Sequence, residues 1–462
     1  MDTTAGRGWK RGTGAPSKCH GPARKPLDAS RSPAGRSGEN AWTRVGPGPC
    51  VGTSCPEGPA PVILDIFSEL QAARPAEEID ARTLFEQAID QARLADELGF
   101  GCWWAVEHHT DPEFSFSSAP DLVLTAIARH TRRIRLGTSG ILSPFAINHP
   151  VRIAERGALV DVFSNGRLEL GLARSGGAEW ETFGVDPDST REQLREALHV
   201  IPRIWTSHSF KWESEHLRVP ERDFVPKPVQ KPHPPLWQTV SNPQSCAMAG
   251  ELGVGMLGSC VFTPVETNRP AILDYGRGLA RCRPAGEFVN DQRAMFTVVH
   301  CTKTKREAIE SRAGEAALWF MNLAPRVFRV ERANWVNLIR GAVGEGAASG
   351  RMLDGPEAPP SAEDLNDPVP AIALLNRQRA GHALDPEEVY EVLDPIDTVV
   401  IGDVDTCRRK LRRIAGQGLD RLMCLMQFGP LPHEAAMRSI RLLGERLVPE
   451  FHAEPQRRRA VG

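Results

Sequence analysis

The chain has 462 residues, of which 41% are hydrophobic and 25% are charged, and its formal net charge is −2. Because acidic and basic residues nearly balance, no charge surplus favours nucleic acid or an anionic membrane as the main partner. No apolar run reaches the roughly 18 to 20 residues that span a bilayer, and the ten scattered cysteines form neither a disulfide framework nor a zinc site.

Residues 1–60 differ in composition from the rest of the chain. They are rich in Gly, Pro, Ser and Arg and have few apolar positions. Such a segment cannot bury enough surface to offset its ordering entropy, so we expect a disordered N-terminal extension. Its basic composition is also that of an organelle transit peptide, although no amphipathic helix is evident. Because it contains no apolar signal core, we expect a cytoplasmic protein.

From residue 61 to residue 451, apolar strand-like runs alternate with amphipathic helix-like segments. The alternation predicts a closed α/β (β/α)₈ TIM barrel, which needs about 250 residues. The main alternative is a doubly wound open sheet, but no GxGxxG turn follows the first strand. The expected strands are 62–67, 101–109, 134–138, 168–172, 234–240, 253–258, 294–301 and 421–426, and the expected helices are 80–98, 121–130, 151–162, 190–205 and 433–447.

The segment at about 302–397, after the seventh expected strand, is too long for one barrel helix. It carries Trp319 and Trp335 on helical patterns and then a Gly/Pro/Ala-rich part at 341–370. We expect a long insertion that acts as a lid over the barrel, as an oligomer contact or as a disordered segment. Residues 452–462 are expected to form a C-terminal tail.

The second expected strand ends in Glu107, His108 and His109. A buried strand that stops at ionisable groups is how α/β folds place chemistry at strand ends. Because neighbouring side chains of an extended chain point to opposite sides, only one of the two histidines can face a shared site. The alternative is one buried hydrogen-bonding histidine beside one surface histidine.

Three further strand ends carry candidate ligand contacts. After the third strand, the small residues Ser139 and Gly140 allow a flat ring to approach the backbone, or they form a plain tight turn. After the fourth strand, an arginine enters a glycine-rich loop that suits a phosphate or simply a surface ion pair. After the fifth strand, short polar residues can cap a helix whose amides attract an anion. The last two groups are Arg174, Ser175 and Gly176, and Ser241, Asn242 and Ser245.

From about residue 62 to 451, the order and spacing of these segments resemble the bacterial luciferase-like family of flavin-dependent monooxygenases. The resemblance is carried by the Glu-His-His run at 107–109, by Arg-Leu-Gly-Thr at 135–138 and by the segment from His149 to Glu155. It continues through Asp161, the loop at 171–177, Phe-Gly at 183–184 and the pieces at 427–429 and 448–449.

The resemblance implies a (β/α)₈ barrel that holds reduced FMN at its C-terminal face. It makes His108 the catalytic base and Glu107 a cofactor contact, and it places Ser139 and Gly140 against the isoalloxazine ring, often through a non-proline cis peptide. Arg174 would grip the flavin phosphate, helped by its neighbours Ser175 and Gly176 and by the loop of Ser241, Asn242 and Ser245. A neutral imidazole at His108 would then move the proton that oxygen chemistry requires.

Three departures argue against light emission and a long-chain aldehyde substrate. Ala173 stands where the luciferases carry a reactive cysteine, and Ser241 replaces a glutamate. The segment 302–397 does not match the mobile region of the luciferases in detail. The expected function is a monooxygenase that uses reduced FMN and O₂ on a small organic substrate, as a homodimer, with a separate flavin reductase because no nicotinamide motif is visible.

Three alternatives remain on the sequence alone. The same barrel could use a flavin or a deazaflavin for hydride transfer without oxygen insertion. It could also bind flavin without catalysis. A metal-dependent hydrolase could use Glu107, His108, His109 and His149, but adjacent histidines do not share one face of a strand, and we expect no metal.

Overall fold

The expected eight-stranded parallel barrel is confirmed in the computed structural model, which describes residues 62–72, 78, 80–328, 358–451 and 459–460. The strands follow one another around the barrel in chain order, and the pairings of β9 with β11, β11 with β13 and β13 with β1 close it. The barrel strands are β1 (Ile63–Ser68), β2 (Cys102–Ala105), β3 (Arg135–Thr138), β5 (Leu168–Ala173), β8 (Leu236–Thr239), β9 (Gly255–Ser259), β11 (Arg293–Thr302) and β13 (Arg421–Leu425).

Two short strands that were not expected from the sequence pair with barrel strands. β4 (Ile141–Leu142) pairs with the end of β5, and β12 (Val400–Asp403) pairs with the second half of β11. β11 is long because its first half pairs with β9 and β13 while its second half continues beside β12.

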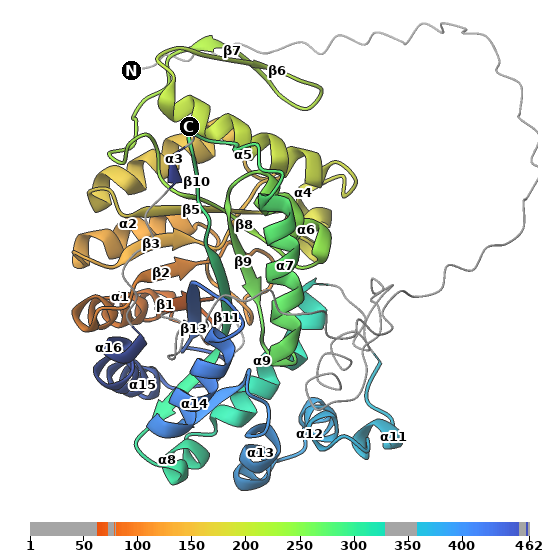
Figure 1. The fold of residues 1–462 in the computed structure, drawn as a ribbon. Coiled ribbons are helices and arrows are strands. Elements are labelled where there is room, and N and C mark those ends of the chain that lie inside the picture. Colours follow the sequence, from red (N-terminus) through yellow and green to blue (C-terminus); the bar gives the residue numbers. More distant parts are fainter. Residues whose placement is uncertain (1–61, 73–77, 79, 329–357, 452–458, 461–462) are drawn as a thin grey trace, which may run out of the picture. The chain divides into compact units, whose positions relative to one another are not determined.

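The helices begin and end at local signals. α1 (Ala81–Leu98) starts where the Asp80 side chain accepts from the Arg82 amide and ends at Gly99, which adopts the left-handed conformation. α1, α2 and α3 lie beside β1, β2 and β3 on one side of the barrel (Figure 1). The other helices that cover the barrel are α2 (Pro120–His130), α3 (Pro150–Ser164), α5 (Thr190–Thr206), α6 (Pro243–Glu251), α7 (Asn268–Leu279), α14 (Val404–Ala415), α15 (His433–Arg446) and α16 (Val448–Phe451).

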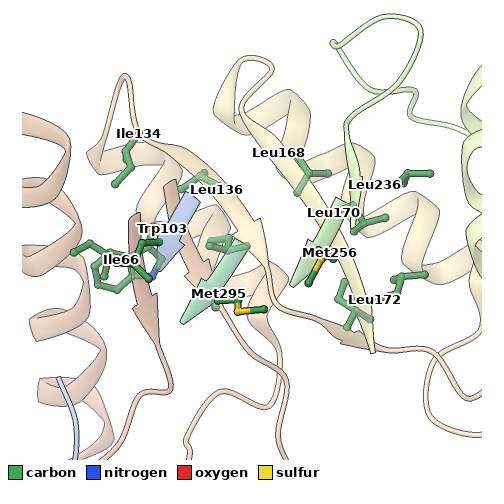
Figure 2. Packing of buried hydrophobic residues seen from close by; sticks show 14 of the residues in the cluster. Ile66, Trp103, Ile134, Leu136, Leu168, Leu170, Leu172, Leu236, Met256 and Met295 are labelled. Carbon is green, nitrogen blue, oxygen red and sulfur yellow. The ribbon is translucent and has the colours of Figure 1, made fainter. Parts of the chain in front are cut away.

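The barrel strands are buried on both faces, so their side chains form two apolar layers. The outer layer lies between strands and helices and contains Ile66, Trp103, Leu136 and Leu170, which Figure 2 shows on adjacent strands. The inner layer fills the barrel and includes Trp104, Trp237 and Leu257 among other residues. Two-sided burial explains why the strands read as continuous apolar runs.

The segment after β11 is helical where the structure describes it. α9 (Ala313–Phe328) is apolar on several faces, and its buried residues join the same cluster as the barrel interior. α11 (Ala362–Leu365), α12 (Pro370–Arg379) and α13 (Pro386–Leu393) gather beside α9 in Figure 1, after the short α8 (Lys305–Glu310). Trp319 lies on α9 as expected, whereas Trp335 falls outside the described residues, as do the 1–60 extension and most of the expected tail.

Several smaller elements complete the fold. A hairpin of β6 (Phe210–Glu213) and β7 (Arg218–Arg222) follows α5, and α4 (Gly177–Phe183) follows β5. β10 (Phe288–Val289) pairs with β14 (Arg459–Ala460), and a single 3₁₀ turn spans Val265–Thr267. Within the described ranges, no helix is both long and apolar enough to cross a membrane.

Candidate functional site

The Glu-His-His run does not continue the second strand as expected. β2 ends at Ala105, and residues 107–109 belong to the loop that follows it. The strand stops because the chain turns to meet its own downstream loop. Ser117 donates its hydroxyl to the Val106 carbonyl at 2.5 Å and accepts the His108 amide on its own carbonyl at 3.0 Å. The predicted strand boundary is therefore wrong, but the residues stay at the carboxyl end of the barrel.

His108 lies between two carboxylates. Its Nδ1 is 3.2 Å from Glu179 Oε1, and its Nε2 is 3.8 Å from Glu69 Oε2. Because an ionised carboxylate can only accept, Nδ1 carries the proton toward Glu179 and Nε2 is the working nitrogen. Burial lowers the pKa of His108, but the hydrogen bond to Glu179 and the charges of Glu69 and Glu179 outweigh it, so the pKa is raised. The raised pKa widens the pH range in which His108 is protonated, whereas the family resemblance led to the expectation of a neutral imidazole.

Glu179 fixes this arrangement from α4. Its two oxygens accept hydrogen bonds from the ring of His108, from the backbone amide of His109 at 2.9 Å and from the hydroxyl of Ser175 at 2.6 Å. Burial raises the pKa of Glu179, yet these bonds and the His108 charge lower it overall, so the group is held ionised. Through Ser175, Glu179 joins the loop after β5 to His108.

The two adjacent histidines point to different surroundings, as expected. The ring of His109 lies 3.2 Å from Glu107 Oε1 and meets Phe183 edge-on, whereas the ring of His108 meets Phe114 edge-on. Glu107 is buried, and it also accepts from the Leu142 amide and from Asn148, each at 2.9 Å. Glu107 therefore ties the loop after β2 to the loops after β3.

The Ser139–Gly140 peptide bond is cis, as the family resemblance implied. A Cβ at Gly140 would lie 2.7 Å from the carbonyl carbon of Leu172, so the close approach of the β5 backbone explains the glycine. Ser139 is half-buried and donates its amide to Ala105 at 2.8 Å. Of this pair, Ser139 has the side chain that remains available as a ring contact.

Arg174 lies in the loop after β5 and is held without an acidic partner. Its guanidinium donates twice to Thr190 Oγ1, at 3.0 and 2.8 Å, and lies 5.9 Å from the ring centroid of Trp180. Burial and the nearby charge of Arg191 both lower the pKa of Arg174. In the part of the chain that the structure describes, no carboxylate forms an ion pair with either arginine. Two neighbouring guanidinium groups without an acid suit a phosphate.

Gly176 precedes α4 in an extended conformation, and a Cβ placed there would meet nothing within 4 Å. Open space beside this loop is compatible with a ligand but does not require one. Ser175 stands at φ 66°, in the left-handed region, with its hydroxyl turned to Glu179.

The polar group after β8 forms a helix cap. Asn242 Oδ1 accepts from the Ser245 amide at 2.9 Å, and Ser245 Oγ accepts from the amides of Ser241 and Asn242 at 3.0 and 3.1 Å. This capping box begins α6 and satisfies amides that an anion would otherwise use. His149 is likewise a cap, because its Nδ1 accepts from the Val151 amide at 3.2 Å at the start of α3.

Across the described ranges, no group of three His, Cys, Asp or Glu side chains has a geometry that could hold a metal ion. His149 is exposed at the start of α3 and bonds only its own helix among its printed contacts. The residues required by the hydrolase alternative are thus not gathered into one cluster.

Three residues of this site were missed as candidates from the sequence. Glu69 follows β1 directly, Glu179 lies one helical turn after the Arg174 loop, and Arg191 lies in the first turn of α5. Glu69 had a recognisable signal, since a charged residue that ends the first buried run is a strand-end position. Arg191 had none, because a helical arginine is ordinarily a solvated surface residue.

The chain is similar in sequence and in fold to known proteins. The model of a family described as luciferase-like monooxygenase matches residues 66–421. The oxygenase component of the flavin-dependent trigonelline monooxygenase of Acinetobacter baylyi is 31% identical over 183 residues, which is 39% of this chain and 50% of the relative. The chain thus spans about half the length of this curated relative.

Solved structures with the same fold include two with different named cofactors. The oxygenating constituent of 3,6-diketocamphane monooxygenase from Pseudomonas putida, in complex with FMN, has a TM-score of 0.63 and 18% identity, over 84% of this chain and 99% of that one. The coenzyme F420 dependent tetrahydromethanopterin reductase of Methanopyrus kandleri has a TM-score of 0.57 and 19% identity, over 85% of this chain and 100% of that one. At these identities the likeness shows the fold.

Proposed function

The chain belongs to the luciferase-like monooxygenase family, and we propose that it is an oxygenase that uses reduced FMN and O₂ to oxidise a small organic substrate. Family membership makes it an oxidoreductase of the flavin- or F420-dependent kind. The observation that carries the finer proposal is the pair Arg174 and Arg191, which lacks an acidic partner among the described residues and is joined through Ser175 and Glu179 to His108.

Arg174 and Arg191 would hold the FMN phosphate. Arg174 is oriented by Thr190 and Trp180, so little side-chain freedom is lost when an anion binds. Ser175 and Gly176 lie beside it as further contacts. The loop after β8 could also contact the phosphate, through polar groups that do not take part in its capping box. The residues concerned are Ser241, Asn242 and Ser245, and the exposed Ser241 hydroxyl is one such group. Ser139 would face the isoalloxazine ring, with Gly140 holding the chain close to β5.

Reduced FMN, when bound, supplies the electrons that activate O₂. His108 would provide the proton, because Glu179 holds its Nδ1 and Nε2 is the nitrogen that would exchange a proton with the bound groups. Glu107 fixes the loop that carries His108.

Aromatic side chains at the barrel mouth would exclude water from it. Phe114 contacts His108 edge-on, with ring centroids 5.1 Å apart, and lies 6.0 Å from Phe320 of α9. Phe67 and Phe296 stack at 4.2 Å inside the barrel. The described part of the insertion therefore acts as a cover, which supports the lid reading of residues 302–397. An apolar cover would keep water away from the reacting groups and would favour an apolar substrate.

Two partners belong to the proposal. A separate flavin reductase would deliver reduced FMN, in keeping with a relative named as an oxygenase component. A second copy of the chain would cover the apolar face of α2 and α3, where Leu122 is 69% and Phe163 47% exposed. We expect Leu122→Lys to reduce a dimer to monomers in sedimentation velocity; a monomeric wild-type protein contradicts the homodimer.

The test mixes the purified protein with reduced FMN without oxygen and then admits air. We expect oxidised flavin absorbance to return more slowly with the protein than without it, and O₂ to be consumed when an accepted substrate is present. Return at the rate of free flavin contradicts the proposal and favours hydride transfer with a flavin or coenzyme F420, or flavin binding alone. Reduced riboflavin is the matched control, since it lacks the phosphate that Arg174 and Arg191 would hold.

A further inference from the structure

Glu69 is a buried carboxyl group at the mouth of the barrel that the proposed function does not use. It follows Ser68, the last residue of β1, and its side chain is 4% exposed. The Ser115 hydroxyl donates to the Glu69 carbonyl at 2.6 Å, which fixes the backbone. Within the described residues, Glu69 Oε2 accepts no hydrogen bond. A buried carboxylate oxygen without a partner costs free energy, so this position calls for an explanation.

The base that faces this oxygen is His108, whose Nε2 lies 3.8 Å away. Among the described residues, the other titratable groups whose charges act on the imidazole are Glu179, which bonds the opposite ring nitrogen, and Glu107, which bonds His109. Glu179 already accepts bonds from Ser175 and from the His109 amide, and these favour its ionised form. Glu69 is thus the carboxyl with an oxygen left to exchange a proton with Nε2.

We propose that Glu69 and His108 share one proton, so that Glu69 is a second acid–base group of the site and reprotonates His108 from inside the barrel. In the step, the O–H bond of the Glu69 carboxyl breaks and an N–H bond forms at His108 Nε2. A neutral pair becomes a carboxylate and an imidazolium, with no other reactant. Because 3.8 Å exceeds a hydrogen bond, the proton crosses after a small side-chain approach or through one bridging water.

The charges around the pair support this exchange. Burial raises the pKa of Glu69 to about 7, with the His108 charge lowering it and the Glu179 charge raising it. The pKa of His108 is raised as well, in part by the charge of Glu69, so the protonation of each group affects that of the other. The role in turnover rests on the proposed function, whereas the shared proton belongs to the protein by itself.

The test is made on the full chain without flavin. Histidine carrying ¹³C at Cε1 and glutamate carrying ¹³C at the carboxyl carbon report both titrations by NMR, and His108→Asn and Glu69→Gln assign the signals. Glu315→Gln is the matched control, because Glu315 is also a buried glutamate but pairs with Arg312 on α9. We expect a glutamate transition near pH 7 that is lost in Glu69→Gln, and a His108 pKa that falls in that variant but not in the control.

An unchanged His108 titration in Glu69→Gln, or a wild-type Glu69 that titrates in the ordinary carboxyl range, overturns the proposal. If Glu69→Gln does not fold, Glu69→Asp replaces it, because the shorter side chain moves the carboxyl group away from His108. The same measurement is then made: a changed His108 titration supports the proposal, and an unchanged one overturns it. In the working enzyme, Glu69→Gln is expected to remove one ionisation from the pH profile of turnover while FMN affinity stays unchanged. The two proposals can fail separately. If flavin reoxidation is not slowed by the protein but the NMR titrations show the shared proton, the proposed function is rejected and the proposal for Glu69 and His108 is kept.

Discussion

At the scale of the residue, the site depends on which groups surround His108. The sequence showed a histidine at a strand end, but the carboxylates that set its protonation come from β1 and α4, far away along the chain. Glu179 holds Nδ1 and Glu69 faces Nε2, and the pKa of His108 is raised, so the imidazole keeps its proton to a higher pH than an ordinary histidine does. The proposed role of proton donor is thus compatible with the role of base that the family resemblance implies.

Protonation of His108 should stabilise the fold in a defined pH window. Its pKa is raised above the usual 6.5, so the folded chain binds this proton more tightly than the unfolded chain does. The stabilisation is complete below pH 6.5 and is lost as the pH rises through the raised value. We expect His108→Asn to lower the free energy of unfolding most below that point, and less at higher pH, in urea titrations between about pH 5 and 9. A difference that does not vary with pH would contradict this assignment.

Arg174 should discriminate between flavins by their phosphate. A charge-assisted hydrogen bond contributes about 1.5–3 kcal/mol, so Arg174→Ala should weaken FMN by roughly 10- to 100-fold more than riboflavin in fluorescence titrations. Arg195→Ala is the control, because Arg195 lies one turn along α5 from Arg191 and pairs with Glu192. Equal weakening of FMN and riboflavin would remove the phosphate role from Arg174.

At the scale of the element, the sequence predicted those parts whose signals are local. Buried runs gave all eight barrel strands to within a few residues, and the Asp80 and Gly99 caps bounded α1. β4 and β12 were missed because two and four residues that pair only with a distant strand have no periodicity of their own. β2 was extended too far because its end is set by hydrogen bonds to Ser117, which local composition does not reveal. The contacts of Glu69 and Arg191 are likewise tertiary.

The loop after β8 allows a helix cap to be separated from a ligand contact. Asn242→Ala removes the side chain that accepts from the Ser245 amide, which should cost about 1 kcal/mol of stability. If the loop is a cap alone, FMN affinity stays unchanged while the urea midpoint falls. Gln244→Ala is the control, because Gln244 is exposed in the same helical turn and takes no part in the capping box. If Asn242→Ala instead weakens the binding of FMN but not of riboflavin, this loop contacts the FMN phosphate.

At the scale of the whole barrel, the residues that stabilise the fold lie within the strands, whereas the residues of the candidate site lie at the carboxyl ends of the same strands. Asp65 lies on β1 four residues before Glu69, roughly 13 Å away at the rise of a strand. It accepts two hydrogen bonds from Arg421 of β13 at 2.7 Å and one from Trp104 at 2.9 Å. Glu169 forms a similar buried cluster with Arg135 and Trp237. These ion pairs join strands that are distant in sequence, beneath the residues that would contact the flavin.

The Asp65–Arg421 pair should show that the scaffold can be weakened without changing the site. Burial raises the pKa of Asp65 and the Arg421 charge opposes this, so each group depends on the other to remain charged inside the barrel. Asp65→Asn leaves a buried guanidinium unpaired and should cost about 3–5 kcal/mol in urea unfolding. The double change Asp65→Leu with Arg421→Met should recover most of that loss, because an apolar pair carries no desolvation penalty. FMN affinity and the His108 titration should be unchanged in any variant that remains folded at the assay temperature. Weaker FMN binding in the stable double variant would contradict this expectation. It would mean that the charges of Asp65 and Arg421 influence FMN binding as well as stability.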